Sequence, residues 1–254
     1  MAEKQKNQAI IIKQEEIAYD IYSMWIKTSM EATAKPGQFV SLYCHDNTKL
    51  LPRPISICEI DREDGALRLV YRVAGAGTKE FSQYHTGMEI DVVGPLGNGF
   101  PLMNKKAMLI GGGIGIPPML QLGKELPGET QIVLGYRDEL FLKDQFDELG
   151  AVYVATEDGK NGTKGTVIDA IKEHQLDAEV IYACGPKPML KAVKTFAIEN
   201  NIECYVSMEE RMACGIGACL ACTCQSTKED EHSHVHNKRV CKDGPVFLAT
   251  EVEL

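Results

Sequence analysis

Positive charge is scarce in this 254-residue sequence, which has 27 Lys and Arg against 36 Asp and Glu and a formal net charge of −9. A chain with a pI near 5.2 lacks the basic surface that nucleic acids and anionic membranes attract. Apolar runs are short, and none approaches the roughly 20 residues needed to span a membrane. Residues 1–7 lack the apolar core of a signal peptide. The sequence therefore predicts a cytoplasmic protein that binds neither nucleic acid nor membrane.

What is present is an ordinary globular composition, 44% hydrophobic and 25% charged, over a length that suits one large domain or two smaller ones. Residues 1 to about 100 contain short runs rich in β-branched and aromatic residues, such as 38–43 and 67–71, separated by turn sequences. This pattern predicts a closed antiparallel barrel or a sandwich. The glycine-rich stretch 94–99 is the predicted boundary.

The pattern changes at about residue 103, where strands and helices begin to alternate. Buried-type strands are predicted at 107–110, 131–134, 151–154 and 180–183, each followed by a helical stretch. Such alternation predicts a parallel sheet with helices on both faces. The last segment, from about 207 to 254, has little regular pattern and carries a cluster of cysteines.

Four of the nine cysteines lie within residues 214–224. Because disulfides are rare in a reducing cytoplasm, this cluster indicates a metal or redox site. Cys214, Cys219 and Cys222 have the spacing C-x4-C-x2-C, and Cys241 follows, which is the plant-type arrangement for a [2Fe–2S] cluster. The intervening residues are small enough for the loop to fold around inorganic sulfurs; they include Gly215, Gly217, Ala218 and Ala221.

A structural zinc site also uses four thiolates, but zinc loops favour C-x2-C pairs, so the sequence favours the iron–sulfur cluster. Cys224 is interpreted as a spare thiol, since C-x-C spacing leaves little room for two ligands of one cluster. Three alternating histidines on a charged loop are interpreted as solvated side chains; they are His232, His234 and His236.

Phosphate-binding features are predicted in the first segment. A string from Arg53 to Ser56 offers a guanidinium for a bidentate phosphate clamp, although an isolated arginine is equally a surface charge. The stretch 71–78 ends a strand in a glycine turn and a helix-like start. Gly77 and Thr78 would present backbone N–H groups at that helix N-terminus, which suits a pyrophosphate.

A dinucleotide turn is predicted between a strand and a helix. It is glycine-rich, with glycines at Gly111, Gly112, Gly113 and Gly115. Glycine lets the backbone approach a pyrophosphate, but Ile116 occupies the third glycine position of G-x-G-x-x-G, so the motif is incomplete. Cys184 and Gly185 repeat the strand–turn–helix arrangement later in the chain. Cys184 is either a small core residue or a cofactor-facing one.

Together these features resemble the ferredoxin–NADP reductase superfamily. The strings 207–219 and 240–247 are similar to the PyrK family, the electron transfer subunits of class 1B dihydroorotate dehydrogenase. The resemblance covers essentially the full chain. It implies an α+β multidomain protein with an FAD-binding β-barrel domain (1–101), an NAD-binding α/β domain (102–206) and a [2Fe–2S] cluster-binding segment (207–254).

Residue roles follow from the same resemblance. The implied FAD contacts are Arg53, Pro54, Ile55, Ser56, Val70, Tyr71, Arg72, Gly77 and Thr78. The implied cluster ligands are Cys214, Cys219, Cys222 and Cys241. A hydroxyl such as that of Ser56 suits the isoalloxazine edge. The glycine turn, with Cys184 and Gly185, is assigned to NAD+.

The resemblance also implies an activity and a partner. Dihydroorotate would be oxidised in a separate FMN-containing catalytic subunit, and electrons would pass through the cluster and FAD to NAD+ in pyrimidine biosynthesis, in a heterotetramer of two of each subunit. NAD+ is favoured over NADP+ because Arg137 stands beside Asp138 and Glu139, which would repel a 2′-phosphate. The alternatives are an NAD(P)H-linked reductase subunit for sulfide, sulfite or ferredoxin, and a non-catalytic dinucleotide-sensing module with structural zinc.

Overall fold

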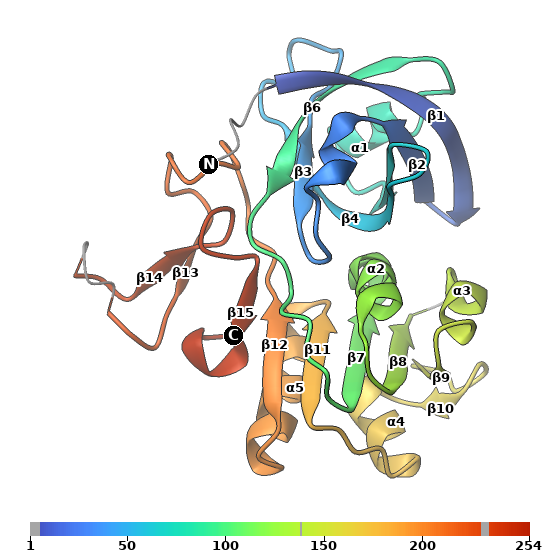
Figure 1. The fold of residues 1–254 in the computed structure, drawn as a ribbon, viewed down its shortest axis with the longest axis vertical. Coiled ribbons are helices and arrows are strands. Elements are labelled where there is room, and N and C mark those ends of the chain that lie inside the picture. Colours follow the sequence, from blue (N-terminus) through green and yellow to red (C-terminus); the bar gives the residue numbers. More distant parts are fainter. Residues whose placement is uncertain (1–5, 138, 230–233) are drawn as a thin grey trace.

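The computed structural model describes residues 6–137, 139–229 and 234–254. The chain begins with a closed barrel of six antiparallel strands in the order β1-β2-β5-β4-β3-β6 (Figure 1). The strands are β1 (Lys6–Ala18), β2 (Ile21–Lys27), β3 (Phe39–Leu42), β4 (Arg53–Asp61), β5 (Ala66–Arg72) and β6 (Glu89–Leu96), with η1 (Ser29–Ala32) and α1 (Ala76–Phe81) between them. Pairing of β1 with β6 closes the barrel, so the first segment is a barrel and not a sandwich.

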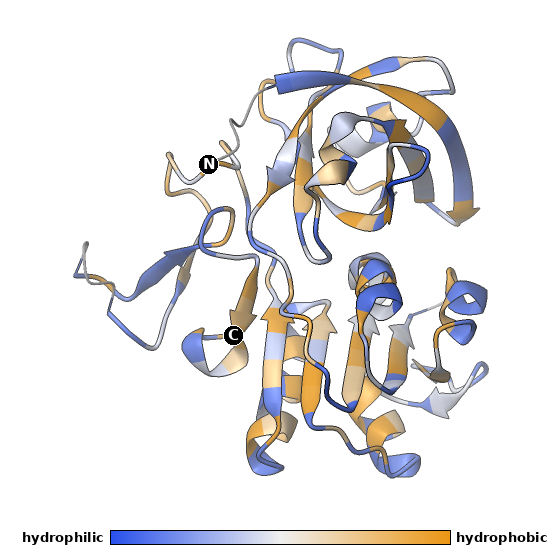
Figure 2. Cartoon of the chain, viewed as in Figure 1, coloured by the Kyte–Doolittle hydropathy of each residue, from blue (hydrophilic) through white to orange (hydrophobic). Residues whose placement is uncertain are grey.

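Alternating side chains fill the interior of the barrel. In β1, Ala9 and Ile11 are buried, whereas Ile10 and Ile12 between and beyond them are exposed. Met24 of β2 lies opposite Leu69 of β5, and both are fully buried. Figure 2 shows this mixture of hydrophobic and hydrophilic residues along β1. The barrel interior thus forms a hydrophobic cluster of its own, whereas other barrel residues, such as Val70 and Phe39, join the cores of the sheet.

A seven-stranded sheet follows, in the order β10-β9-β8-β7-β11-β12-β15. Its strands are β7 (Ala107–Gly112), β8 (Thr130–Tyr136), β9 (Ala151–Thr156), β10 (Thr163–Lys164), β11 (Val180–Cys184), β12 (Glu203–Ser207) and β15 (Val246–Leu248). The accompanying helices are η2 (Gly113–Gly115), α2 (Pro117–Glu125), α3 (Lys143–Asp147), α4 (Val167–Glu173) and α5 (Lys187–Glu199). All neighbouring strands are parallel except β15, which runs antiparallel to β12.

Both faces of this sheet are covered, as the sequence predicts. Along β7, Met108 and Ile110 join the core under α4 and α5, whereas Leu109 joins the core under α2 and α3. Strands buried on both faces are nearly continuously hydrophobic, and Figure 2 shows this for β7 and β11. None of the helices in the described ranges is long and apolar enough to cross a membrane.

Two boundaries are set by features that the sequence pattern does not reveal. The string from Arg53 to Ser56 forms the start of β4, because Arg53 pairs with Leu42 of β3. The helical stretch predicted after the strand at 131–134 is limited to α3, because Leu142 adopts a left-handed conformation with φ of 62° immediately before it. A β-branched, apolar pattern alone does not locate such boundaries.

The last segment folds beside both domains (Figure 1). It contains the hairpin of β13 (Thr223–Gln225) and β14 (Asn237–Arg239), then β15 and η3 (Ala249–Glu251). Asn98, in the link between the barrel and β7, donates to the Val246 carbonyl at 2.8 Å and accepts from the Val246 amide at 2.9 Å. A side chain on Gly97 would collide with Pro245. The cysteine segment is therefore fixed at the junction of barrel and sheet.

A buried polar cluster also fixes the barrel to the helices of the sheet. The Arg68 guanidinium of β5 forms an ion pair with Glu59 at 2.5 Å and donates to Gln145 of α3 at 2.7 Å. Lys124 of α2 forms a second ion pair with Glu59. Arg68 and Glu59 are both buried, so each charge is stabilised by the other, and removing one would leave the other buried and unpaired.

Helix α4 begins with a capping box. The Asp169 amide donates to the Thr166 hydroxyl oxygen, and the Thr166 amide donates to the Asp169 carboxylate at 2.7 Å. We expect Thr166→Ala to lower the free energy of unfolding by about 1 kcal/mol, measured by urea denaturation at pH 7. Hydrogen bonds from the backbone and side chain of Thr166 lower the pKa of Asp169.

The lowered pKa of Asp169 determines how the cost of Thr166→Ala varies with pH. A carboxyl with a lowered pKa contributes stability above its unfolded pKa and loses it in acid, so the cost should fade below about pH 4. Thr195→Ala, on the exposed side of α5, is the matched control and should unfold like the wild type. An equal cost for both substitutions would contradict the capping role.

Candidate functional site

A cleft of about 290 Å³ lies between the barrel and the last segment. The barrel side is made of predicted site residues: Pro54, Ile55 and Ser56 of β4, and Val70, Tyr71 and Arg72 of β5. The opposite wall contains residues to which the sequence analysis assigned no cofactor role, namely Ser207, Met208, Glu209, Glu210, Met212 and Pro245. Their signal in the sequence is that they lie in the strings 207–219 and 240–247, and five of them precede Cys214.

Arg53 lies over the start of α1. A Cβ atom built on Gly77 would collide with the Arg53 guanidinium, so only glycine allows this close approach. The guanidinium donates to the Leu51 carbonyl. The Thr78 hydroxyl oxygen accepts from the amides of Ala74 and Gly75 at 2.9 and 3.1 Å, which holds the turn before the helix. The structure thus brings the predicted Arg53, Gly77 and Thr78 to one end of the barrel.

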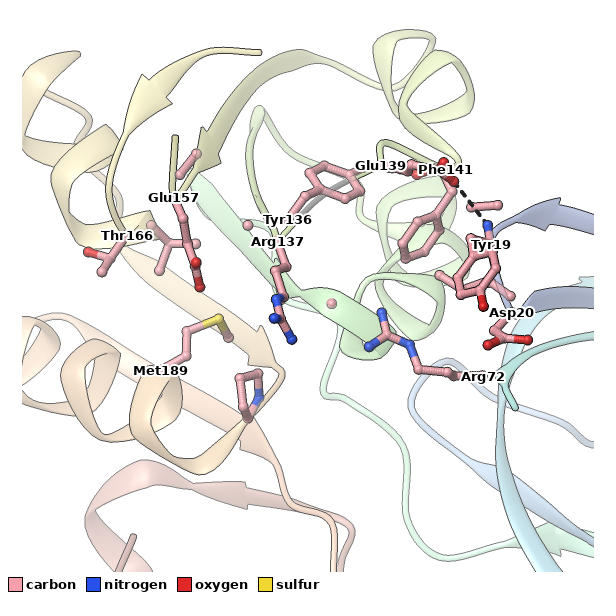
Figure 3. Close-up of a pocket in the computed structure, with 18 of the residues that line it drawn as sticks. Tyr19, Asp20, Arg72, Tyr136, Arg137, Glu139, Phe141, Glu157, Thr166 and Met189 are labelled. Atoms are coloured by element: carbon pink, nitrogen blue, oxygen red, sulfur yellow. Dashed lines mark hydrogen bonds between the residues drawn. The ribbon is translucent and has the colours of Figure 1, made fainter. Parts of the chain in front are cut away.

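A second, larger cleft of about 620 Å³ lies between the barrel and the carboxyl ends of β7, β8 and β9. Figure 3 shows Arg72 reaching into it from the barrel and Arg137 from the end of β8. Glu157 follows β9, and Met189 comes from α5. The Tyr19 amide of the barrel donates to the Glu139 carboxylate across the cleft at 2.9 Å. Crevices at the carboxyl ends of parallel strands are where dinucleotides bind in such sheets.

The glycine turn forms one side of this second cleft. Gly112 and Gly113 line it, and Gly113 has φ of 52°, a conformation that favours glycine. Gly111 and Gly115 do not line it; a Cβ on Gly115 would collide with the Cys184 carbonyl group. Gly115 therefore serves the packing of the turn against the end of β11, whereas a Cβ on Gly111 would meet Ile116 within the turn itself.

Cys184 and Gly185 lie beneath the same turn. Gly185 packs against Met189, and the Cys184 side chain is buried in the sheet core. Burial raises the pKa of the Cys184 thiol to about 12, with a smaller opposing effect from the Ser207 side chain. Cys184 lines neither cleft, so the structure shows it as a core residue at the strand end.

The four predicted cluster ligands form two pairs of thiols. The side chains of Cys214 and Cys219 contact each other, as do those of Cys222 and Cys241. Within the described ranges, no three His, Cys, Asp or Glu side chains surround one metal position. Each iron of a [2Fe–2S] cluster takes two cysteine ligands, so two thiol pairs on one loop and its neighbour fit this cofactor.

Backbone amides of the cysteine loop point at the sulfurs. Gly217 donates to the Cys241 sulfur at 3.1 Å, and Ala218 donates to the Cys214 sulfur at 3.3 Å. Gly215 and Gly217 have φ of 68° and 85°, which lets the loop turn its N–H groups inward.

These donors stabilise thiolate at Cys214. Burial raises the pKa of Cys214, but hydrogen bonds from the Ile216, Cys219 and Ala218 amides and from the Cys219 side chain outweigh it and lower the pKa to about 6. Thiolate is the form that binds metal. At Cys241 burial dominates and, with the neighbouring Cys222, raises the pKa to about 12.

The remaining candidate metal ligands lie elsewhere. Cys224 is buried in the hairpin, where it pairs with Lys238 of β14. His234 is exposed, and its Nδ1 lies 3.2 Å from a Glu229 carboxylate oxygen. His236 is exposed as well, and His232 lies outside the described residues.

The three sites follow one another in space. Met212 lines the first cleft and is two residues from Cys214, so the cysteine loop adjoins that cleft directly. Arg72 lines both clefts, so the first and second clefts meet there. This order, from cysteine loop to barrel cleft to strand-end cleft, is that of an electron relay ending at a dinucleotide.

Comparison with known proteins agrees with this arrangement. The profile of the oxidoreductase FAD-binding domain matches residues 8–100, that of the oxidoreductase NAD-binding domain residues 109–195, and that of the iron–sulfur cluster binding domain of dihydroorotate dehydrogenase B residues 209–253. The electron transfer subunit of dihydroorotate dehydrogenase B (NAD(+)) from Listeria innocua is 46% identical, over 96% of this chain and 97% of its own length. The corresponding subunit from Fusobacterium nucleatum is 44% identical, over 94% and 95%.

The chain belongs to this family of dihydroorotate dehydrogenase B electron transfer subunits. Among solved structures, that of the NADH-dependent reduced ferredoxin–NADP oxidoreductase is similar with a TM-score of 0.87 and 31% identity, over 100% of this chain and 91% of that one. The expected family, the barrel and parallel-sheet fold and the cofactor set of FAD, NAD and iron–sulfur cluster are confirmed. The two clefts and the cysteine loop are thus features of an electron transfer subunit.

Proposed function

We propose that this chain carries electrons from a dihydroorotate-oxidising FMN subunit to NAD+ in pyrimidine (UMP) biosynthesis, using a [2Fe–2S] cluster and FAD. The observation that supports this proposal most directly is that the three sites adjoin one another. The cleft assigned to FAD adjoins the cysteine loop, and Arg72 lines both this cleft and the dinucleotide cleft. When bound, the cluster supplies single-electron transfer, and the flavin supplies the exchange between single electrons and the hydride accepted by NAD+.

The residues of this chain position the cofactors and shield them from water. Arg53 provides a guanidinium for the flavin phosphates, with the amides of Gly77 and Thr78 beside it, while Ser56 and Tyr71 line the cleft for the ring. Cys214, Cys219, Cys222 and Cys241 hold the cluster, and the loop amides donate to their sulfurs.

Two further groups of residues complete the assignment. Gly112 and Gly113 allow the NAD+ pyrophosphate close to the backbone, with Gly111, Gly115, Cys184 and Gly185 supporting the turn. The domain limits that follow are 1–101, 102–206 and 207–254, and β15 of the last part extends the sheet of the second.

The catalytic partner docks, in this proposal, on the cysteine loop. Cys219 is exposed, and the apolar side chains of Ile216 and Leu220 on either side of it are 45% and 60% exposed. Exposed apolar residues around an electron-transfer centre suit a protein partner, because docking would bring the partner's cofactor close and exclude water. The assembly proposed is a heterotetramer of two subunits of each kind, in the cytoplasm.

Reconstitution tests the function. The chain, expressed together with an FMN-containing dihydroorotate dehydrogenase catalytic subunit, should purify with it, contain FAD and two irons per chain, and reduce NAD+ with dihydroorotate. A chain that copurifies instead with a sulfide-, sulfite- or ferredoxin-linked enzyme would favour the reductase alternative. Colourless, zinc-loaded protein would favour the sensing module.

Selectivity between NADH and NADPH tests the strand-end cleft. Glu157 and Glu139 both line it, and their negative charges oppose a 2′-phosphate. We expect NADH to reduce the bound flavin more efficiently than NADPH. Glu157→Gln should lower the ratio of the NADH rate to the NADPH rate about fivefold, since a like-charge repulsion near 4 Å in water is worth about 1 kcal/mol. Rapid-mixing rates with both nucleotides measure this; Glu173→Gln on α4 is the control, and a preference for NADPH would overturn the assignment.

A further inference from the structure

Arg239 of β14 connects the two stretches of chain that carry the proposed cluster ligands. Its Nη1 donates to the Gly217 carbonyl at 3.1 Å, in the loop of the first three cysteines. Its Nε donates to an Asp243 carboxylate oxygen at 3.2 Å, and its backbone amide donates to the same oxygen at 2.8 Å. These contacts close a turn around Cys241, the proposed fourth ligand. One side chain thus holds the loop and the turn together.

Asp243 fixes the direction of the Arg239 side chain. Its second carboxylate oxygen accepts from Nη2 at 3.4 Å, so the carboxylate pairs with one edge of the guanidinium. The two side chains are only 31% and 32% exposed. Because the guanidinium is planar and rigid, pairing along one edge also orients its remaining N–H groups. Nη1 is therefore aimed at the loop.

The Gly217 carbonyl shares its peptide unit with a donor to sulfur. A peptide unit is planar, so a hydrogen bond that holds its carbonyl also orients the N–H group at its other end. That N–H group belongs to Ala218 and donates to the Cys214 sulfur at 3.3 Å. A hydrogen bond accepted by the carbonyl also polarises the unit and strengthens the donor. Arg239 is thus connected to the Cys214 sulfur through one peptide.

Gly217 contacts the second thiol pair as well. Its own amide donates to the Cys241 sulfur at 3.1 Å. Carbons of the Lys242 side chain lie over it, where a Cβ atom would collide with them. A displacement of Gly217 would therefore weaken a hydrogen bond to one sulfur of each pair.

Hydrogen bonds to the sulfurs help to determine how readily an iron–sulfur cluster accepts an electron. Reduction adds one negative charge to the cluster, and N–H groups aimed at its sulfurs stabilise that charge. Such donors therefore raise the reduction potential. This potential matters to the proposed relay, because every electron that reaches the flavin from the partner passes through the cluster.

We propose that Arg239 is a positioning residue that raises the potential of the cluster through the Gly217–Ala218 peptide. The guanidinium holds the carbonyl end of this peptide, and the N–H end stabilises the reduced cluster at the Cys214 sulfur. The proposal rests on the assignment of the cluster to the four cysteines in the proposed function.

A redox titration of the full chain, loaded with FAD and cluster, tests this role. We expect Arg239→Gln to lower the equilibrium constant for reduction of the cluster about tenfold, which for one electron is about 59 mV toward more negative potential. The paramagnetic signal of the reduced cluster, recorded against the applied potential at pH 7, measures the shift. The flavin potential in the same sample should keep its wild-type value, since Arg239 is not among the described residues that line either cleft.

Two further variants separate orientation from charge. Arg239→Lys keeps the positive charge but lacks the fork that pairs with Asp243, so we expect it to shift the potential as Arg239→Gln does. Lys242→Gln removes an exposed, salt-screened positive charge over the same glycine and keeps the three carbons that cover it, so its potential should stay close to the wild-type value. A wild-type potential in Arg239→Lys, or equal shifts in Arg239→Gln and Lys242→Gln, would indicate a charge effect and overturn the proposal.

Iron analysis covers the remaining outcomes. Both Arg239 variants should keep two irons per chain, because all four thiols are still present. Loss of iron from both variants would mean a merely structural role, which would overturn the proposal and leave the proposed function intact. A wild-type chain that holds no iron would instead overturn the proposed function.

Discussion

Cys219→Ser abolishes dihydroorotate-driven reduction of NAD+ and leaves the FAD in place; this is the largest effect that we expect. Cys219 contacts Cys214 at the exposed end of the cysteine loop, so the substitution removes one thiol of a pair. A serine hydroxyl remains protonated where a thiol ionises, and it does not replace a thiolate on iron. The flavin cleft keeps its barrel wall, because the inward side chains of β4 and β5, such as Ile57 and Leu69, pack in the interior of the barrel, away from the cysteine loop.

Three measurements define the outcome for Cys219→Ser. Iron analysis should show loss of the cluster, the flavin-to-protein ratio should stay at the wild-type value, and NADH should still reduce the flavin. Turnover with dihydroorotate and NAD+ should fall to background in the complex. Retained turnover would contradict the assigned relay.

Cys224→Ser is the matched control because Cys224 lies in the same segment. Its thiol is buried in the hairpin of β13 and β14, and neither thiol pair includes it. We expect this variant to keep its iron and its turnover. Loss of iron from Cys224→Ser alone would instead assign the fourth ligand to Cys224.

How much of this site the sequence predicts depends on how local each feature is. The spacing of Cys214, Cys219 and Cys222 encodes one loop, and the structure forms that loop as a continuous stretch. Likewise the glycine turn follows directly from one strand and one helix. Both were predictable because their parts are neighbours in the chain and glycine has few other reasons to occur in such density.

The opposite wall of the flavin cleft is different, because it forms only in the folded chain. Met208 and Glu209 follow β12, and they meet Ser56 and Tyr71 of the barrel through contacts across more than a hundred residues. Nothing in the stretch 207–212 by itself indicates a flavin. The distinction between Gly113, which lines the dinucleotide cleft, and Gly115, which packs on Cys184, is also set by tertiary contact.

Arg53→Ala should release FAD. The guanidinium lies over Gly77 at the start of α1, and a guanidinium can donate two N–H groups to one phosphate. A hydrogen bond to a charged group is worth about 2 kcal/mol, which corresponds to about a 30-fold weaker Kd for FAD. The flavin-to-protein ratio after gel filtration should fall, while the iron content stays at the wild-type value because the cysteine loop is untouched.

Gly77→Ala reaches the same end by a different path, and this makes the interpretation specific. The added methyl group would occupy the space of the Arg53 guanidinium, so the arginine has to move although it is still present. We expect the same loss of flavin from both single variants and little more from the double variant, because the two substitutions disrupt one interaction. Lys79→Ala removes an exposed positive charge from the same helix and should keep its flavin. Equal loss in Lys79→Ala would mean that FAD responds to net charge on α1 and not to the contact between Arg53 and Gly77.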